Sequence, residues 1–231
     1  MQIEETALSG VLILTPARHG DARGFFSESW NRRTLEKAGV TLPEFVQDNH
    51  SLSARAGTLR GLHYQAPPHA QGKLVRCGRG RLFDVAVDAR EGSPTYGRAV
   101  GVELSAENGR QLWVPAGFLH GFVTREDDTE IVYKCTDYYD QGADGAVRWD
   151  SVDIDWGVAD PVLSANLHGA AEAMLAEGAH QDAAETFQAI LGEEPDNAAA
   201  WGGLIRAHVA AGDLDAADAA LAQVSPAAAN A

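Results

Sequence analysis

Short strand-like runs recur through residues 1 to about 163, and they limit this part of the chain to a mainly β fold. The runs are rich in Val, Ile, Phe, Tyr and Trp and lie between clusters of Gly, Pro, Asp and Asn. Apolar and polar residues alternate in "LFDVAVD" and "AVGVEL", which is typical of strands with one buried face. Many short strands at this spacing predict a barrel, a jelly roll or a sandwich. We expect strands at "GVLIL", "FVQDNHSL", "GKLVRC", "RLFDVAVD", "AVGVEL", "RQLWVP", "HGFVT" and "TEIVYKC", and a short helix at "WNRRTLEKAG" that Gly39 closes.

The composition changes after residue 163. From Ser164 to the end, 24 of 68 residues are Ala, and ten acidic side chains stand against one basic side chain, Arg206. Apolar residues recur here at helical spacing. The segment also repeats itself with a period of 34 residues, which is the period of tetratricopeptide helix pairs. The repeated positions are Gly178, Ala183, Phe187 and Ile190, followed by Gly212, Ala217, Leu221 and Val224.

This repeat sets the expected domain organisation. Chance similarity between Ala-rich stretches is the alternative, but matching positions at one period favour a true repeat. We therefore expect a β domain over residues 1–166 and a small all-α, tetratricopeptide-like segment over residues 167–231. Two repeats are fewer than usually stand alone.

Composition also excludes some classes of function. The formal net charge of −15 disfavours binding to nucleic acid, whose phosphates an acidic protein repels. We expect no membrane span and no signal peptide, because no apolar run is long enough. The two cysteines, Cys77 and Cys135, do not form a CxxC pair, so we expect a reducing, cytoplasmic location.

The stretch "RGLHYQAPPHAQGKLVR" concentrates Arg60, His63, His69 and Lys73 and is the first candidate site. It could bind a metal, bind a phosphate or perform acid–base chemistry. Cupin-type barrels bind metal through an H-x-H pair, a downstream Glu and a later His. Only the later half of that pattern is present, in "PAGFLHG", which supplies His120. We therefore predict no metal.

Acid–base chemistry is the stronger interpretation of this stretch. A neutral imidazole such as that of His63 can remove a weakly acidic proton, and Lys73 could stabilise the resulting anion. A phenol from "YKCTDYYD" could return a proton. In a strand, His63 would share a pocket with Arg60 only if the strand bends at Gly61. Packed tyrosines and solvated cations are the alternative, and the spacing does not decide between them.

Residues 1 to about 163 carry a series of motifs in a fixed order. They are "GDARGFFSESWN", "FVQDNHSLS", "TLRGLHYQ", "AQGKLVRC", "LFDVAVDAREGSPTYG", "LSAENGRQLWVPAGFLHGF", "YKCTDYYD" and "IDW". Through these motifs the chain resembles the dTDP-4-dehydrorhamnose 3,5-epimerase family. The resemblance implies a cupin-type jelly-roll barrel and a metal-independent, cofactor-free isomerase of nucleotide-sugar biosynthesis.

The resemblance also implies roles for individual residues. His63 corresponds to the base that removes protons beside the C4 ketone, and Tyr133 to the acid that protonates the opposite face. Lys73 and His120 correspond to residues of the sugar site, with Lys73 on the enolate oxygen. The remaining positions of the dTDP-sugar site are Arg23, Glu28, Gln47, Asp48, Asn49, the phosphate contact Arg60, the ring-stacking candidate Tyr139, and Asp144. The resemblance further implies a homodimer whose protomers exchange N-terminal strands.

The sequence departs from the family where the two parts join. The family has Leu-Ser-x-Lys-Asp there, and its Asp hydrogen-bonds the catalytic His; this chain has "LSANL", with Leu167 at the Asp position. The segment after it resembles the tetratricopeptide tail of thioredoxin-like co-chaperones, which implies a protein partner. Two alternatives therefore remain: a low-activity sugar-nucleotide-binding cupin whose tail recruits that partner, and a single-site epimerase of a related 4-keto-deoxy sugar nucleotide.

Overall fold

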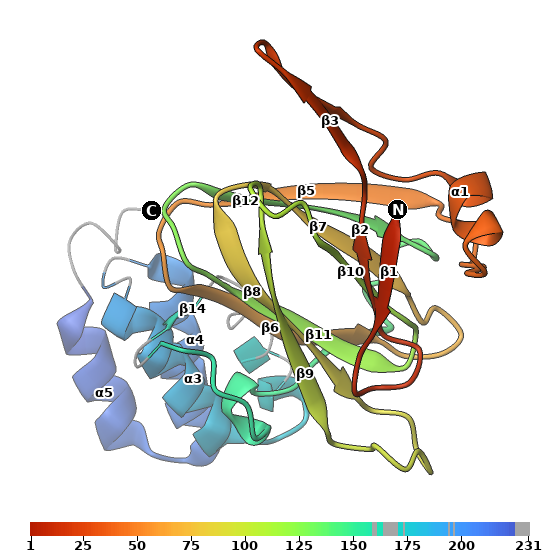
Figure 1. Ribbon diagram of the computed structural model, residues 1–231. Coiled ribbons are helices and arrows are strands. Elements are labelled where there is room, and N and C mark those ends of the chain that lie inside the picture. Colours follow the sequence, from red (N-terminus) through yellow and green to blue (C-terminus); the bar gives the residue numbers. More distant parts are fainter. Residues whose placement is uncertain (159–160, 164–170, 173, 194, 196, 225–231) are drawn as a thin grey trace. The chain divides into compact units, whose positions relative to one another are not determined.

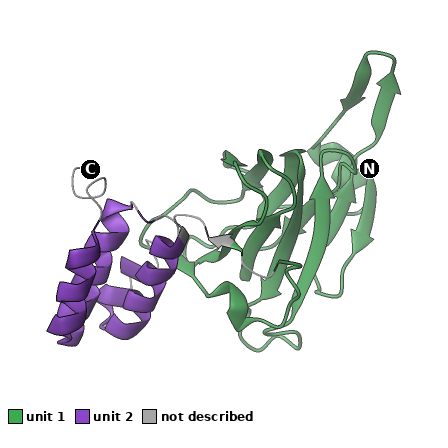
Figure 2. Ribbon diagram, turned by 90° about the vertical axis from the view of Figure 1, so that its left-hand side faces the viewer, with its two compact units in different colours: residues 1–161 green, residues 162–231 purple. Residues whose placement is uncertain are grey.

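The computed structural model describes residues 1–158, 161–163, 171–172, 174–193, 195 and 197–224. The chain divides into two compact units, Met1–Pro161 and Val162–Ala231, which Figure 2 shows in green and purple. Strands form the first unit and helices dominate the second. The predicted order, a mainly β part followed by a helical part, is confirmed.

Two large antiparallel sheets form the body of the first unit (Figure 1). Their inward side chains form one apolar core, to which Val75 and Ile131 contribute from one sheet and Leu82 and Leu104 from the other. The first sheet has the order β1 (Gln2–Glu5), β2 (Leu12–Thr15), β10 (Gln111–Val114), β7 (Lys73–Arg79), β12 (Thr129–Cys135) and β5 (Gln47–Ser53). The second has the order β13 (Asp144–Ala146), β6 (Thr58–Gln65), β11 (Phe118–Thr124), β8 (Arg81–Asp88) and β9 (Ala99–Ser105).

All eight predicted strand runs form strands, and the predicted helix is α1 (Arg32–Lys37). Asn31 caps its first turn, and Gly39 follows its end with φ +85°. The alternation of "LFDVAVD" predicted a half-buried strand, but the second half of β8 is buried on both faces, as is the whole of β11. The runs also missed the hairpin of β3 (Arg18–Asp21) and β4 (Gly24–Ser27), which projects from the sheets (Figure 1).

A β-bulge interrupts the pairing of β6 with β11. His120 pairs with His63 and Phe122 pairs with Arg60, so β6 has one residue more than β11 over this interval. An extra residue moves the following side chains to the other face of a strand. Gly61, with φ +130°, lies in the bulge, where an added Cβ would come within 2.5 Å of the Cα of Gly121. The bulge therefore brings Arg60 and His63 to the same face.

The second unit begins with the short strand β14 (Val162–Leu163), and its described helices are α3 (His180–Glu193), α4 (Ala198–Ala211) and α5 (Leu214–Gln223). Helices α3 and α4 pack closely because Gly203 leaves room for the ring of Phe187; a Cβ at Gly203 would lie 2.2 Å from that ring. Gly178 and Gly212, 34 residues apart, both adopt a left-handed conformation, with φ +83° and +79°. The backbone thus repeats where the sequence does.

Candidate functional site

His63 is the centre of a polar cluster between the two sheets. It lies on β6, two residues beyond the bulge, and the bulge directs Arg60 toward the same space. The pKa of His63 is lowered to about 4, chiefly by burial and in addition by the positive charges of Lys73, His120 and Arg60. The imidazole is therefore neutral at neutral pH and able to accept a proton.

His120 faces His63 across the two paired strands. Its Nε2 lies 2.8 Å from Oδ1 of Asp84 on β8, and the ring N–H donates to that carboxylate. Asp84 is fully buried and His120 is 8% exposed. A buried carboxylate bound to one ring nitrogen fixes the tautomer and orientation of an imidazole. The motifs did not identify Asp84, although a carboxylate among the apolar residues of "LFDVAVD" was a visible signal.

Lys73 and Tyr133 come from the opposite sheet. Burial lowers the pKa of Lys73, against the opposing effect of Cys135 and the carboxylates Asp144 and Asp84. Burial likewise raises the pKa of the Tyr133 phenol, so that it stays protonated at neutral pH. The cluster therefore combines a neutral imidazole, an amine and a protonated phenol.

Side chains alternate between the two faces of β5, so its three predicted site residues do not all face the cluster. Gln47 and Asn49 face inward. The hydrogen bond from Asn49 to Tyr133 partly offsets the rise that burial causes in the pKa of the phenol. Asp48 faces the other side, where its carboxylate lies 2.6 Å from the Lys134 ammonium. Asp48 is thus not brought together with His63, because side chains i and i+1 of a strand point to opposite faces.

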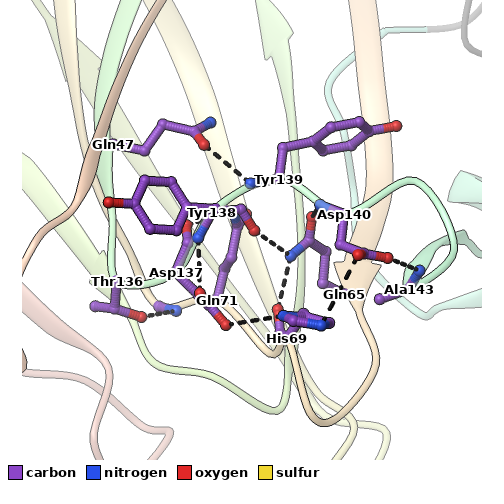
Figure 3. Close-up of polar contacts among 11 residues, drawn as sticks. Gln47, Gln65, His69, Gln71, Thr136, Asp137, Tyr138, Tyr139, Asp140 and Ala143 are labelled. Atoms are coloured by element: carbon purple, nitrogen blue, oxygen red, sulfur yellow. Dashed lines mark hydrogen bonds and ion pairs between the residues drawn. The ribbon is translucent and has the colours of Figure 1, made fainter.

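The segment after β12 carries Tyr139 (Figure 3) and leads to Asp144 at the start of β13. The backbone N–H of Tyr139 donates to Oε1 of Gln47 at 2.9 Å, and its phenol donates to Oδ2 of Asp144 at 3.4 Å. The ring itself is exposed. Burial raises the pKa of Asp144, although Lys73 opposes this shift. This segment therefore adds an exposed ring and a carboxylate beside the cluster.

Arg23 and Glu28 lie on the projecting hairpin and just after it. Arg23 forms an ion pair with Asp21 at the tip, and Glu28 binds Asn31 and Thr34 at the start of α1. The hairpin extends away from the sheets (Figure 1), so one chain does not bring Arg23 to its own His63.

Two further expectations concern a metal and Leu167. Among the residues that the structure describes, no group of three or more His, Cys, Asp or Glu side chains could hold a metal ion. Asn166 and Leu167 lie outside the described residues, so the expected effect of the missing carboxylate on His63 stays a prediction.

Within the described part of the chain, no helix is both long and apolar enough to cross a membrane.

Two family models match the chain. The model described as dTDP-4-dehydrorhamnose 3,5-epimerase matches residues 5–173, and the one described as tetratricopeptide repeat matches residues 174–231. Among curated proteins, the dTDP-4-dehydrorhamnose 3,5-epimerase of Shigella flexneri is 52% identical over 166 residues, which cover 71% of this chain and 91% of that protein.

Solved structures agree with these matches. The dTDP-4-dehydrorhamnose 3,5-epimerase of Bacillus anthracis with TDP and PPi bound is 47% identical, with a TM-score of 0.69, over 71% of this chain and 95% of that chain. The dTDP-6-deoxy-D-glucose-3,5-epimerase of Legionella pneumophila, in complex with dTDP-4-keto-L-rhamnose, is 45% identical, with a TM-score of 0.66, over 71% and 88%. The predicted jelly-roll fold, the resemblance and the isomerase class are confirmed, as is the tetratricopeptide resemblance of the tail.

Proposed function

Because this chain belongs to the dTDP-4-dehydrorhamnose 3,5-epimerase family, we propose that it epimerises dTDP-4-dehydro-6-deoxy-glucose at C3 and C5, giving dTDP-4-dehydro-rhamnose. The observation that carries the proposal is the polar cluster, in which His63 of one sheet and Tyr133 of the other share Arg60 as a charged neighbour. Two proton-transfer groups from opposite sheets can act on opposite faces of a sugar ring, which inversion requires.

The proposed chemistry is proton transfer beside the C4 ketone. His63 takes the proton as the C–H bond breaks, and the electron pair moves to the C4 oxygen as an enolate. The Lys73 ammonium stabilises that charge, and a site shielded from water strengthens the interaction. Tyr133 then donates its proton to the opposite face of the same carbon, and solvent restores both groups. The lowered pKa of His63 and the raised pKa of Tyr133 support this division of roles.

The nucleotide end of the substrate is assigned to the rim of the cluster. We propose that Arg60 contacts phosphate, that Gln47 and Asn49 bind the nucleotide and that the exposed Tyr139 ring stacks on thymine. His120 and Asp144 complete the sugar side. The inward direction of Gln47 and Asn49 supports this assignment, whereas the outward, ion-paired Asp48 is left out of it.

Proton NMR in deuterated water tests the reaction. With dTDP-4-keto-6-deoxy-glucose as substrate, the C3 and C5 proton signals should disappear as product resonances grow. His63→Ala should abolish this exchange while leaving dTDP binding intact, because it removes only the base. His50→Ala is the matched control, since His50 is an exposed histidine on β5 that forms an ion pair with Glu130.

Three outcomes would change the proposal. Exchange at one carbon alone would make the protein a single-site epimerase. Binding of dTDP without any exchange would leave a nucleotide-binding protein and no epimerase. Exchange that persists in His63→Ala would remove His63 from the base role.

We also propose a homodimer in which the β3–β4 hairpin of one protomer supplies Arg23 to the site of the other. The exposed hairpin supports this, because Phe25 and Phe26 are 60% and 72% exposed in a single chain. Phe26→Ser should weaken the dimer in sedimentation experiments and raise KM. Tyr96→Ser, which changes an equally exposed ring elsewhere, should do neither; a dimer that survives Phe26→Ser would contradict the proposed arm.

We propose that the helical unit recruits a protein partner and that the whole protein works in the cytoplasm. Leu221 supports the first proposal: it is 60% exposed on α5, whereas its repeat counterpart Phe187 is fully buried. The free, buried cysteines Cys77 and Cys135 support the second.

A further inference from the structure

The irregular segment between β12 and β13, residues 136–143, is attached at its ends by backbone hydrogen bonds and between them by side chains. Gln71 donates from Nε2 to the carbonyl of Asp137 at 2.7 Å, and Gln47 accepts from the backbone N–H of Tyr139 at 2.9 Å. These glutamines come from different parts of the chain and converge on one stretch of backbone (Figure 3).

Gln65 is the most buried of the glutamines that hold this segment, with 7% of its surface exposed. Its Nε2 donates to the carbonyls of His69, at 2.6 Å, and Tyr138, at 3.1 Å. Its Oε1 accepts from the backbone N–H of Asp140 at 2.9 Å. Both donor hydrogens of the carboxamide are therefore used, and a flipped amide would direct its oxygen at two carbonyls. Gln65 binds the backbone on both sides of Tyr139.

The same residue links this segment to His63. Gln65 follows His63 by two positions on β6, and its own backbone pairs with Asp144. The segment from Tyr139 to Asp144 is thus attached to β6 at both ends, beside the imidazole. Loss of the carboxamide would leave partly buried backbone groups without this partner, so we expect the segment to move.

We infer that Gln65 is a positioning residue that sets the place of the Tyr139 ring relative to His63, and with it the span between nucleotide and sugar in the bound substrate. This inference rests on the proposed function, in which Tyr139 stacks on thymine. Gln65 acts through the segment, because it is buried and its polar atoms are already bonded.

A double-mutant cycle tests the inference, with dTDP alone as the ligand and calorimetry as the measurement. Gln65→Leu should raise the Kd for dTDP about tenfold, because a displaced Tyr139 ring would lose its stacking on the base. Tyr139→Ala should raise it similarly. The double variant should bind no more weakly than Tyr139→Ala, because Gln65 acts through that ring. In turnover assays, Gln65→Leu should raise KM and leave kcat unchanged.

Two further variants keep the inference open to refutation. Gln65→Glu keeps the shape of the side chain but sets a carboxylate against two carbonyls, so it should reproduce the effect of Gln65→Leu. Gln141→Leu, at an exposed glutamine of the same segment, should bind dTDP like the wild type. Additive effects of Gln65→Leu and Tyr139→Ala, or an unchanged Kd in Gln65→Leu, would overturn the inference.

The outcomes separate the inference from the proposed function. A wild-type protein that binds dTDP but exchanges no substrate protons would refute the epimerisation, and the Kd cycle would still decide the role of Gln65. A wild-type protein that does not bind dTDP would overturn both.

Discussion

The surroundings of His63, the proposed base, keep its imidazole neutral at pH values well below the usual titration range of a histidine. Burial is the main cause, and the charges of Lys73, His120 and Arg60 add to it. A low pKa makes a base weaker, but it also makes the reactive neutral form available under more acidic conditions. The pH dependence of the reaction should therefore differ from that of an ordinary histidine.

We expect kcat/KM to stay level from pH 8 down to about pH 5 and to fall about tenfold per pH unit below the His63 pKa of about 4. The sign follows from the direction of the shift: a lowered pKa moves protonation, and hence loss of the base, to lower pH. Initial rates across this range, each after a check that the protein remains folded, provide the measurement. A decline centred near pH 6.5 would show that the titrating base is not shifted.

Asp84 leads to a second prediction, because its buried carboxylate is hydrogen-bonded to the His120 ring. Asp84→Asn keeps the shape but removes the charge that fixes the imidazole and opposes the lowered pKa of Lys73. We expect kcat to fall by about ten- to a hundredfold, as when an outer-shell partner of a functional His is changed, with the Kd for dTDP unchanged. Steady-state kinetics and calorimetry on one preparation measure both.

Asp88 supplies the matched control on the same strand. It is also a buried carboxylate, but its partners are Arg90, Ser93 and Thr95, which hold its pKa well below the usual range. Asp88→Asn should lower the melting temperature and leave the kcat of the folded protein unchanged. Equal losses of kcat in both variants would mean that Asp84 acts only through the stability of β8.

The close approach of the paired strands β6 and β11 at the bulge depends on Gly61. In Gly61→Ala, the new Cβ would approach the Cα of Gly121 to 2.5 Å and the carbonyl of His120 to 2.9 Å, at a φ of +130°. Backbone strain of this kind costs about 1–3 kcal/mol, and the overlap adds to it. We expect Gly61→Ala to lower the free energy of unfolding by about 3 kcal/mol or more, as measured by urea unfolding.

Gly57→Ala separates the two causes. Gly57 also has a positive φ, +78°, but an added Cβ there would meet nothing within 4 Å. We expect it to cost about 1 kcal/mol, the penalty of the backbone conformation alone. Similar losses in the two variants would mean that the two strands can move apart at no cost.

Strands and helices with strong patterns could be predicted from the sequence, and features that depend on three-dimensional pairing could not. The alternation of "AVGVEL" and the Gly that ends "WNRRTLEKAG" indicated β9 and α1 correctly. Burial of β11 on both faces depends on what covers the sheet, which periodicity does not reveal. The bulge at Gly61 depends on the partner strand; the sequence indicated only that a bend there would matter.

The candidate site divides in the same way. The motifs and the resemblance singled out His63, Lys73 and Tyr133 as candidates, because these residues lie in recognisable local patterns. Asp84 and Gln65 were not predicted, because they were singled out only by contacts with residues distant in sequence, such as His120 and Tyr138. Asp48 is the opposite case. The motif included it among the candidates, but in the structure its side chain lies on the outward face of β5, paired with Lys134.

The two units each have a core of their own, and this leads to a prediction about the whole molecule. Val75 and Leu104 belong to the β core, whereas Phe187 and Leu204 belong to the helical core. Deletion of residues 170–231 should therefore leave a folded β unit that still dimerises. Circular dichroism melts and sedimentation of the shortened and full chains provide the measurement.

The deletion can contradict two statements separately. Collapse of the shortened chain would refute a β domain that folds without the helices. A folded but monomeric product would show that the helical unit makes the dimer, and the proposed role of the β3–β4 hairpin would then be wrong.

The projecting β3–β4 hairpin has a genetic consequence if Arg23 works in the neighbouring protomer. Arg23→Ala and His63→Ala would each be inactive alone, yet a mixed dimer would contain one intact site, with Arg23 from one chain and His63 from the other. Two defective alleles expressed together would then complement each other. Activity would become a joint property of two polypeptides, and an excess of either inactive allele would still leave one intact site for each wild-type chain.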